Sequence, residues 1–256
     1  MRPRDEKAVS EAVGYIIMVT IVFIAIGLVF TNFVPAADDT EVTEHTKNTE
    51  RVFSVLQSNI YEIVENGVPS RGSEMRLKDG TLSTERDVSE MNVTIQTSSP
   101  PDIERFVGTT HVTYETGAGT LSYENGAIFR RTSTGDAVMI EEPRWRIQEE
   151  GPIIMPMVLA RGAETVGGNQ VVLMEASSTR RVARYRLDSA NATDSEEVEL
   201  EMQSPNAAGW NRYFEDLSAA RVDSFDAAEN ELTVTIDDID DRTLIYSETL
   251  IRMRLE

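Results

Sequence analysis

The chain has 256 residues and a formal net charge of −20, which results from 44 acidic and 24 basic residues. It contains no cysteine, so disulfides, thiolate metal sites and cysteine nucleophiles are excluded. The sequence shows no basic patch of the kind that phosphate contacts require, and we therefore expect no nucleic-acid partner.

The negative charge is spread over most of the chain. Residues 1–37 are neutral overall, so the whole excess lies beyond them, and only three of the basic residues are lysines. A surface this acidic repels itself in dilute buffer, whereas molar salt screens the repulsion. The pattern indicates adaptation to molar salt, and an ordinary acidic protein is the alternative.

The N-terminal segment is apolar. No charged residue occurs from Ala12 to Ala37, and residues 12–34 would form a helix roughly 35 Å long that is hydrophobic on all sides. This length predicts a transmembrane helix, which should end or kink at Pro35. The basic residues before it place the N-terminus in the cytoplasm and the remaining chain outside the cell. We therefore expect a single-pass protein of the cell membrane, with membrane lipid as a partner.

Three interpretations of this segment are open. A cleaved secretory signal usually has a shorter apolar core, and an unprocessed anchor needs no motif. The third starts from Lys7-Ala8-Val9-Ser10, which stands directly before the apolar run. This tetrapeptide resembles the class III signal peptide of archaeal type IV pilins and archaellins. In that family a prepilin peptidase removes the leader and keeps the helix, which here implies a cut between Ala8 and Val9.

The resemblance to haloarchaeal pilins, whose mature chain typically begins Val-Ser-Pro-Val-Ile-Gly, is partial. Val9, Ser10 and Gly14 agree with it, and Glu11 replaces the proline. Glu11 would pair with the new amine of Val9 or with that of a neighbouring subunit, or else it only caps the helix. Gly14 and Gly27 would allow close helix packing, with other pilin-like subunits as partners.

A second helix is expected downstream of Pro35, beginning within the polar residues 38–49. The apolar residues between 52 and 64 recur at helical spacing, which predicts an amphipathic helix from about 43 to 66 that ends at Asn66-Gly67.

Alternating patterns separated by turn residues predict strands in the rest of the chain. The expected strands are 73–77, 81–84, 92–97, 111–116, 120–124, 127–131, 137–141, 153–161, 170–176, 183–187, 196–203, 232–236 and 250–255. Asn125-Gly126 is a strong hairpin signal between two of them. Pro152 and Pro156 disfavour a central position for the strand at 153–161.

The expected fold class is α+β, with an N-terminal transmembrane helix followed by an amphipathic helix packed on a mostly antiparallel, sandwich-like β domain. The expected divisions are a leader peptide at 1–8, a transmembrane or assembly helix at 9–37, a stalk helix at 38–67 and an extracytoplasmic β-rich domain at 68–256.

Residues 205–221 interrupt the strand pattern. Trp210, Tyr213 and Phe214 lie at helical spacing and predict a short helix. They would form either an exposed aromatic binding face or a stripe buried on the sheet, and the buried stripe is favoured. The segments Gly119–Arg130 and Trp210–Phe214 resemble a set of haloarchaeal membrane proteins of unassigned function, which look like pilin relatives with a large β domain. This resemblance implies no specific activity.

The sequence contains no catalytic or nucleotide-binding motif, so we expect neither an enzyme nor a cofactor. His45 and His111 have no clear ligand set around them. Asn92 and Asn191 lie in N-glycosylation sequons, and Asn191 stands in the more loop-like context.

One acidic cluster has oxygen ligands that suit calcium, and it comprises Asp237, Asp238, Asp240 and Asp241. It lacks the glycine and the spacing of an EF-hand loop, so a solvated turn is favoured and no metal is expected.

These patterns together predict a membrane-anchored, pilin-like cell-surface subunit with a structural role in a filament or surface assembly, such as a pilus. An unprocessed anchor that carries an extracellular binding or sensing domain is the alternative. An anchored hydrolase is a more distant one.

Overall fold

A computed structural model describes residues 5–97, 101–133, 135–187, 195–237, 239 and 242–256. At 5–12, 29–44, 109, 195 and 196 only the backbone is described. The chain divides into two compact units, Met1–Thr49 and Glu50–Glu256.

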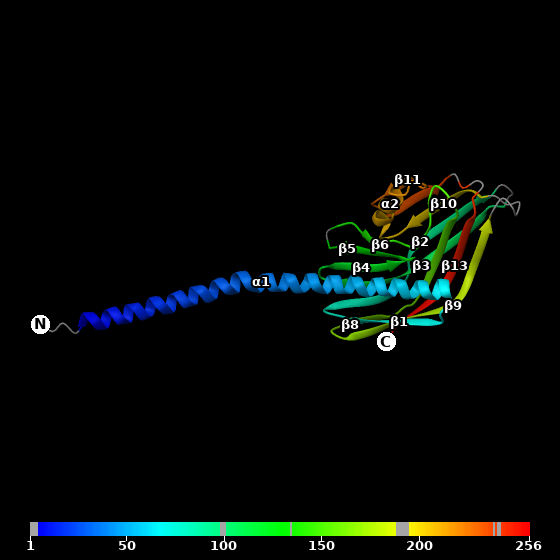
Figure 1. Ribbon diagram of the computed structural model, residues 1–256. Coiled ribbons are helices and arrows are strands. Elements are labelled where there is room, and N and C mark those ends of the chain that lie inside the picture. Colours follow the sequence, from blue (N-terminus) through cyan, green and yellow to red (C-terminus); the bar gives the residue numbers. More distant parts are fainter. Residues whose placement is uncertain (1–4, 98–100, 134, 188–194, 238, 240–241) are drawn as a thin grey trace. The chain divides into compact units, whose positions relative to one another are not determined.

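Helix α1 is continuous from Asp5 to Asn66 and contributes to both units (Figure 1). Regular helix therefore does not end at Pro35, because a proline removes one N–H donor while the hydrogen bonds of the neighbouring turns remain. The end of the helix is as predicted. Gly67 has a φ of 67° and its N–H donates to the carbonyl of Ile63 at 3.2 Å, which is a typical glycine cap.

The prediction of a transmembrane helix has to be corrected. A crossing needs roughly 20 consecutive, predominantly apolar helical residues. Within the described part of the chain, no helix combines that length with sufficient hydropathy. The predicted transmembrane segment, and the single-pass membrane localisation that rested on it, are therefore wrong.

The expected α+β class is wrong as well, because the protein is mostly β. The strands are β1 (Ser70–Arg76), β2 (Gly80–Thr97), β3 (Ile103–Thr116), β4 (Gly119–Glu124), β5 (Ala127–Thr132), β6 (Val138–Glu141), β7 (Ile153–Arg161), β8 (Thr165–Gly168), β9 (Val171–Leu187), β10 (Ser195–Gln203), β11 (Arg221–Asp226), β12 (Glu231–Ile236) and β13 (Leu244–Leu255). A short helix, α2 (Ala207–Glu215), stands between β10 and β11.

The strands form two sheets (Figure 1). One has four strands in the order β1-β9-β13-β7, and the other has nine, in the order β11-β12-β10-β2-β3-β4-β5-β6 with β8 paired to β2. All pairs are antiparallel except β13 with β7. Strand β7 is at the sheet edge, which explains how it accommodates Pro156.

Two long strands replace four short predicted ones. The predicted strands at 81–84 and 92–97 both belong to β2, and those at 170–176 and 183–187 both belong to β9. Each long strand has polar, mostly exposed residues in its middle. These residues interrupt the apolar alternation, so the sequence predicted two short strands in place of each long one. In β2 the register shifts between Glu85 and Ser89, so the strand bulges there.

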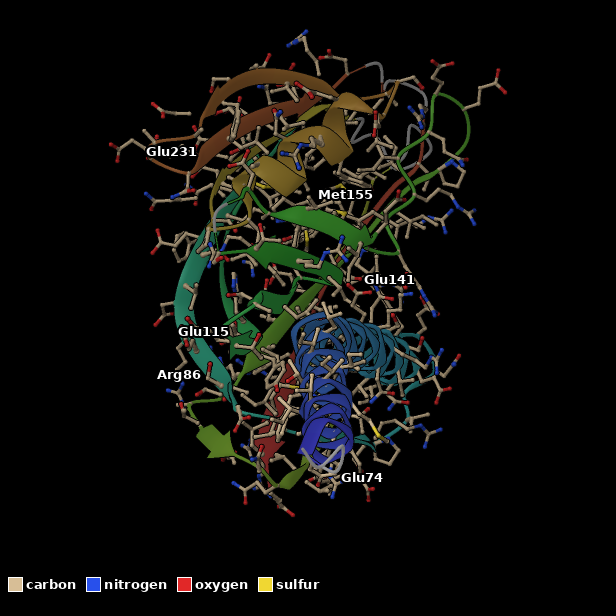
Figure 2. The ribbon with its side chains drawn as sticks, turned by 90° about the vertical axis from the view of Figure 1, so that its left-hand side faces the viewer. Glu74, Arg86, Glu115, Glu141, Met155 and Glu231 are labelled. Atoms are coloured by element: carbon tan, nitrogen blue, oxygen red, sulfur yellow. The ribbon has the colours of Figure 1, made fainter. Side chains whose placement is uncertain are left out.

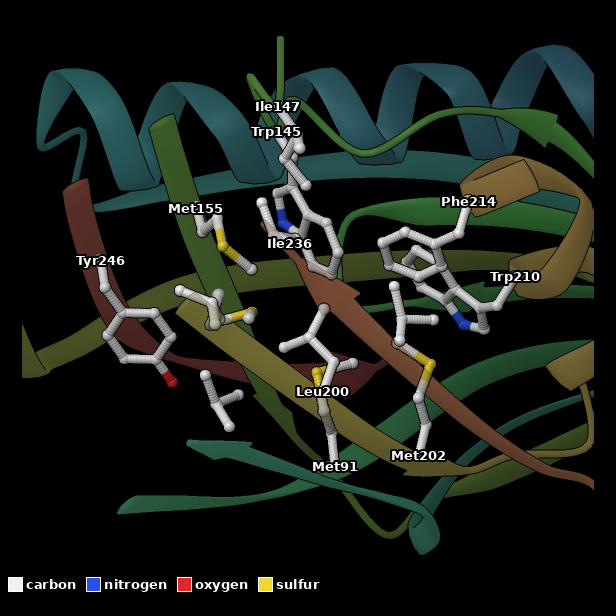
Figure 3. Packing of buried hydrophobic residues seen from close by; sticks show 14 of the residues in the cluster. Met91, Trp145, Ile147, Met155, Leu200, Met202, Trp210, Phe214, Ile236 and Tyr246 are labelled. Atoms are coloured by element: carbon white, nitrogen blue, oxygen red, sulfur yellow. The ribbon is translucent and has the colours of Figure 1, made fainter. Parts of the chain in front are cut away.

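The core consists of two clusters of buried apolar side chains. The first lies between the sheets and combines residues of β2, β10 and β12 with residues of β7 and β13 (Figure 3). The second packs the end of α1, through Phe53, Leu56, Ile60 and Ile63, against strands of both sheets. The predicted amphipathic stripe is therefore confirmed.

A partly buried ion pair also links the two sheets. Glu248 on β13 accepts hydrogen bonds at 2.7 Å from Nε and from Nη2 of Arg105 on β3, and Tyr246 donates a third at 2.8 Å. Glu248 is buried, and these three donors stabilise its charge.

The predicted Asn125-Gly126 hairpin is confirmed. Its turn connects β4 to β5 and forms hydrogen bonds to β7 and α1. Both residues have positive φ, as the two-residue turn between β4 and β5 requires. The side chain of Asn125 accepts the N–H of Val158 on β7 at 2.8 Å. The carbonyl of Gly126 accepts hydrogen bonds from Gln57 and Tyr61 of α1 at 2.8 and 3.3 Å.

Replacing Gly126 by alanine should lower the free energy of unfolding by about 2 kcal/mol. Gly126 has a φ of 91°, and an added Cβ would overlap the hydroxyl of Tyr61. Denaturant unfolding followed by circular dichroism measures the change. Gly67→Ala is the matched control, because Gly67 has a φ of 67° and no atom within 4 Å of its Cβ position. Equal losses in both variants would show that the contact with Tyr61 does not matter.

Candidate functional site

The most unusual surface of the protein is the described part of α1 between residues 13 and 28, which we call the apolar segment. Apart from the half-buried Val19, its large apolar side chains are 46–70% exposed. They are Val13, Tyr15, Ile16, Ile17, Met18, Ile21, Val22, Phe23, Ile24, Ile26 and Leu28. At 100° per residue these positions occupy every side of the helix, so the segment has no polar face.

The two predicted packing glycines lie in this segment. A Cβ built at Gly14 or at Gly27 would meet no atom within 4 Å. The helix surface at both positions is therefore open to close approach by another element. The predicted processing residues, Lys7-Ala8-Val9-Ser10, and Glu11 belong to the backbone of α1, and their side chains lie outside the described residues. The cut after Ala8 stays a prediction.

The predicted aromatic residues are buried. Trp210 and Phe214 are 0% exposed and Tyr213 is 8% exposed, all on α2. Trp210 stacks on Trp145 with ring centroids 5.3 Å apart, and it lies 5.4 Å from the ring of Phe129 (Figure 3). The favoured buried stripe is confirmed, and the alternative of an exposed binding face is wrong.

A buried polar cluster surrounds Glu124, at the end of β4; we call it the Glu124 network. Its other members are Ser89, His111, Ser204 and Asn206, and each of the five is at most 3% exposed. The carboxylate accepts hydrogen bonds from Ser89 Oγ and Ser204 Oγ, both at 2.8 Å, and from Asn206 Nδ2 at 2.9 Å. The Nε2 of His111 lies 3.5 Å from Oε2 of Glu124.

The fold brings this network together from four segments. The bulge in β2, where Asp87 has a φ of 53°, turns Ser89 inward. His111 lies on β3 and Glu124 lies on the neighbouring strand β4. Each stands next to a member of the pair Val112 and Tyr123. Ser204 and Asn206 belong to the connection that leads from β10 into α2. Sequence analysis missed this network because its members are far apart in the chain and glutamates are abundant.

The Glu124 network holds a charge in the core. Burial alone would raise the pKa of Glu124, but the charge of His111 and the hydrogen bonds from His111, Asn206 and Ser89 outweigh it and lower the pKa to about 2. The carboxylate is therefore ionised at neutral pH.

Serine, histidine and an acid meet here, but not in the arrangement of a catalytic relay. A relay places the imidazole between the serine and the acid and uses both ring nitrogens. In this protein Nε2 of His111 lies 2.8 Å from Ser89 Oγ and also faces Glu124, while Ser89 donates its own proton to the carboxylate. The hydroxyl is thus occupied and buried, and the network stabilises the fold where β2, β3, β4 and α2 meet.

The described residues of the remaining predicted sites do not come together in one site. Asn92 is exposed on β2, and its Nδ2 lies 3.4 Å from Oε2 of Glu201. Asp237 accepts a hydrogen bond from Arg221 at 2.9 Å. Asn191 and the aspartates Asp238, Asp240 and Asp241 lie outside the described residues. Among the described residues, no group of three His, Cys, Asp or Glu side chains is arranged to hold a metal ion.

Comparison with known proteins places the chain in a group. Residues 7–254 match the model of a family of unknown function, DUF7289. The chain belongs to this family. It is similar to an uncharacterized protein of Archaeoglobus fulgidus, with 24% identity over 82% of this chain and 83% of that protein. No solved structure matches it.

The match to DUF7289 covers both α1 and the β domain, so the family is defined by the two parts together.

Proposed function

We propose that this member of DUF7289 is a pilin-like structural subunit that assembles with copies of itself through the apolar segment of α1, with no catalytic role. The observation that carries the proposal is the exposure of large apolar side chains on every side of the helix between residues 13 and 28. The resemblance around Lys7-Ala8-Val9-Ser10 supports it, because pilins assemble through this helix.

Exposure on all sides determines what kind of partner can cover the segment. Burying one large apolar side chain fully contributes roughly 1.5–3 kcal/mol, so covering the whole segment would be strongly favourable. A single groove covers one face of a helix and leaves the others in water. A bundle of identical helices covers every face, because each copy contributes the same apolar surface, and Gly14 and Gly27 allow neighbours to approach.

The test is self-association of the full chain with Ile17 and Ile24 both replaced by aspartate. These side chains are 54% and 58% exposed, so the substitutions disturb no core. We expect sedimentation velocity in molar salt to show large assemblies for the unaltered chain and small species for the variant, because each aspartate places a charge inside the helix bundle.

Replacing Phe106 and Val171 by aspartate is the matched control. These side chains are also exposed, at 63% and 56%, but they lie on β3 and β9. The control should assemble like the unaltered chain. Assembly of the Ile17→Asp, Ile24→Asp variant at the same level as the control would refute the proposed function.

A further inference from the structure

Four arginines gather around one pocket in a chain whose net charge is −20. The pocket has a volume of about 660 Å³, within the range of binding sites. We call it the arginine pocket, and its four basic residues are Arg144, Arg146, Arg181 and Arg184. Its floor consists of Ile154, Pro156, Ile245 and Ser247, from the outer face of β7 and β13.

Sheet register explains why these residues meet. Arg184 pairs with Ser247, which pairs with Pro156, so these three residues form one row across the sheet. Arg146 bridges to Ile154 from the other side of β7, so the basic residues stand on both sides of the apolar floor.

A bulge brings the remaining arginine to the same face. Arg181 and Arg184 are three residues apart and would point to opposite faces of a regular strand. The register shifts here, because Glu248 pairs with Ala183 and Thr249 pairs with Arg181. The extra residue turns Arg181 to the face of Arg184. No basic patch was predicted from the sequence, although the segment Arg180–Arg186 contains four arginines.

Within the described part of the chain, three of the four guanidinium groups have no carboxylate partner. Arg144 lies 3.3 Å from a carboxylate oxygen of Glu65 and 4.5 Å above the ring of Tyr61. Among the described residues, no acid pairs with Arg146, Arg181 or Arg184. Guanidinium groups bind carboxylates in a planar, two-bonded geometry, so the pocket is suited to a ligand that carries several carboxylates.

A complementary surface exists on the outer face of the other sheet. There a depression of about 260 Å³ is lined by Glu90, Glu201 and Glu231. Gln203 on β10 pairs with Glu90 on β2 and with Glu231 on β12. Glu201 precedes Gln203 by two residues and lies on the same face of β10, so the three carboxylates gather on one face of three adjacent strands. Figure 2 shows Glu231 pointing away from the interior, where Met155 lies.

We propose that the arginine pocket of one copy binds this acidic depression on a second copy, an inference that rests on the proposed self-assembly. The two sheets pack face to face through the first core cluster, so their outer faces point in opposite directions. A contact between them joins the front of one copy to the back of the next, which leaves both ends open and can repeat along a filament.

The chemistry favours a second copy over a small anion. The arginines stand on opposite sides of a mostly apolar floor that spans β7 and β13, which fits a protein surface better than a compact ion. In molar salt only charges in direct contact attract appreciably, so a docked surface with several paired groups outcompetes diffuse counter-ions.

The test uses two charge-reversed full-length variants. In the first, Arg181 and Arg184 become glutamate, so that both surfaces are acidic. In the second, Glu90 and Glu201 become arginine, so that both are basic. Each variant alone should bind its own copies about tenfold or more weakly than the unaltered chain, because like charges meet. An equimolar mixture should recover association, since each variant supplies the surface that the other lacks.

The matched control reverses Arg252 and Arg254 to glutamate, since these exposed residues of β13 lie outside the pocket and the change in net charge equals that of the first variant. Sedimentation velocity measures all samples. Unchanged association of either variant, or a mixture no better than the variants alone, would overturn the inference.

A second measurement separates this inference from the proposed function. The chain has no cysteine, so Arg184→Cys in one copy and Glu201→Cys in another can form only an intermolecular disulfide. Repeating this trapping in the Ile17→Asp, Ile24→Asp background tests the β-domain contact without the apolar segment. Trapped heterodimers there support the contact even if helix assembly fails, and their absence in both backgrounds refutes it.

Discussion

Replacing Trp210 by alanine should lower the free energy of unfolding by about 4 kcal/mol, as expected for the loss of a large buried aromatic side chain. Trp210 is 0% exposed and its ring lies within 6.0 Å of the rings of Trp145, Tyr213, Phe214 and Phe129. The truncation leaves a cavity beneath α2 that this rigid aromatic group cannot fill. Denaturant unfolding in molar salt, followed by circular dichroism, measures the effect.

Trp210→Phe is the control for this prediction. The indole N–H of Trp210 is buried and has no hydrogen-bond partner among the described residues, so its removal leaves none of their acceptors unpaired. We expect a loss of about 1 kcal/mol from the smaller ring. A loss in Trp210→Ala as small as that in Trp210→Phe would mean that α2 does not depend on this aromatic contact.

Replacing Glu124 by glutamine should lower the free energy of unfolding by about 3 kcal/mol at neutral pH. The pKa of Glu124 is about 2 in the folded protein against 4.5 ordinarily, so the folded state binds the proton less readily than the unfolded state. This stabilisation is fully present above pH 4.5 and is lost as the pH falls toward 2. The difference between the unaltered chain and the variant should therefore shrink across that interval.

Glu115→Gln provides the reference for this measurement. Glu115 is exposed on β3, the strand that also carries His111 (Figure 2). Comparing unfolding at a series of pH values cancels the titration of the other carboxylates, which all variants share. A difference for Glu124→Gln that stays constant from neutral pH to pH 2 would contradict an ionised carboxylate in the core.

Local patterns in the sequence predicted most of the secondary structure. Asn125-Gly126 predicted its hairpin because the two-residue turn requires positive φ at both positions, and few residues adopt it. The spacing of Trp210, Tyr213 and Phe214 predicted both α2 and its buried face. The strand β11 was missed because its side chains are mostly exposed and show no apolar alternation.

The sequence by itself therefore determined the turns, most strands, the end of α1 and the acidic charge of the surface, since each depends on neighbouring residues or on composition. Tertiary structure alone decided that Ser89, His111 and Glu124 share one buried network, and that Arg144 and Arg146 face Arg181 and Arg184. Both groupings depend on sheet register, and a bulge that adds one residue changes which face the following side chains occupy. That choice is made by pairing between distant strands, which no local pattern records.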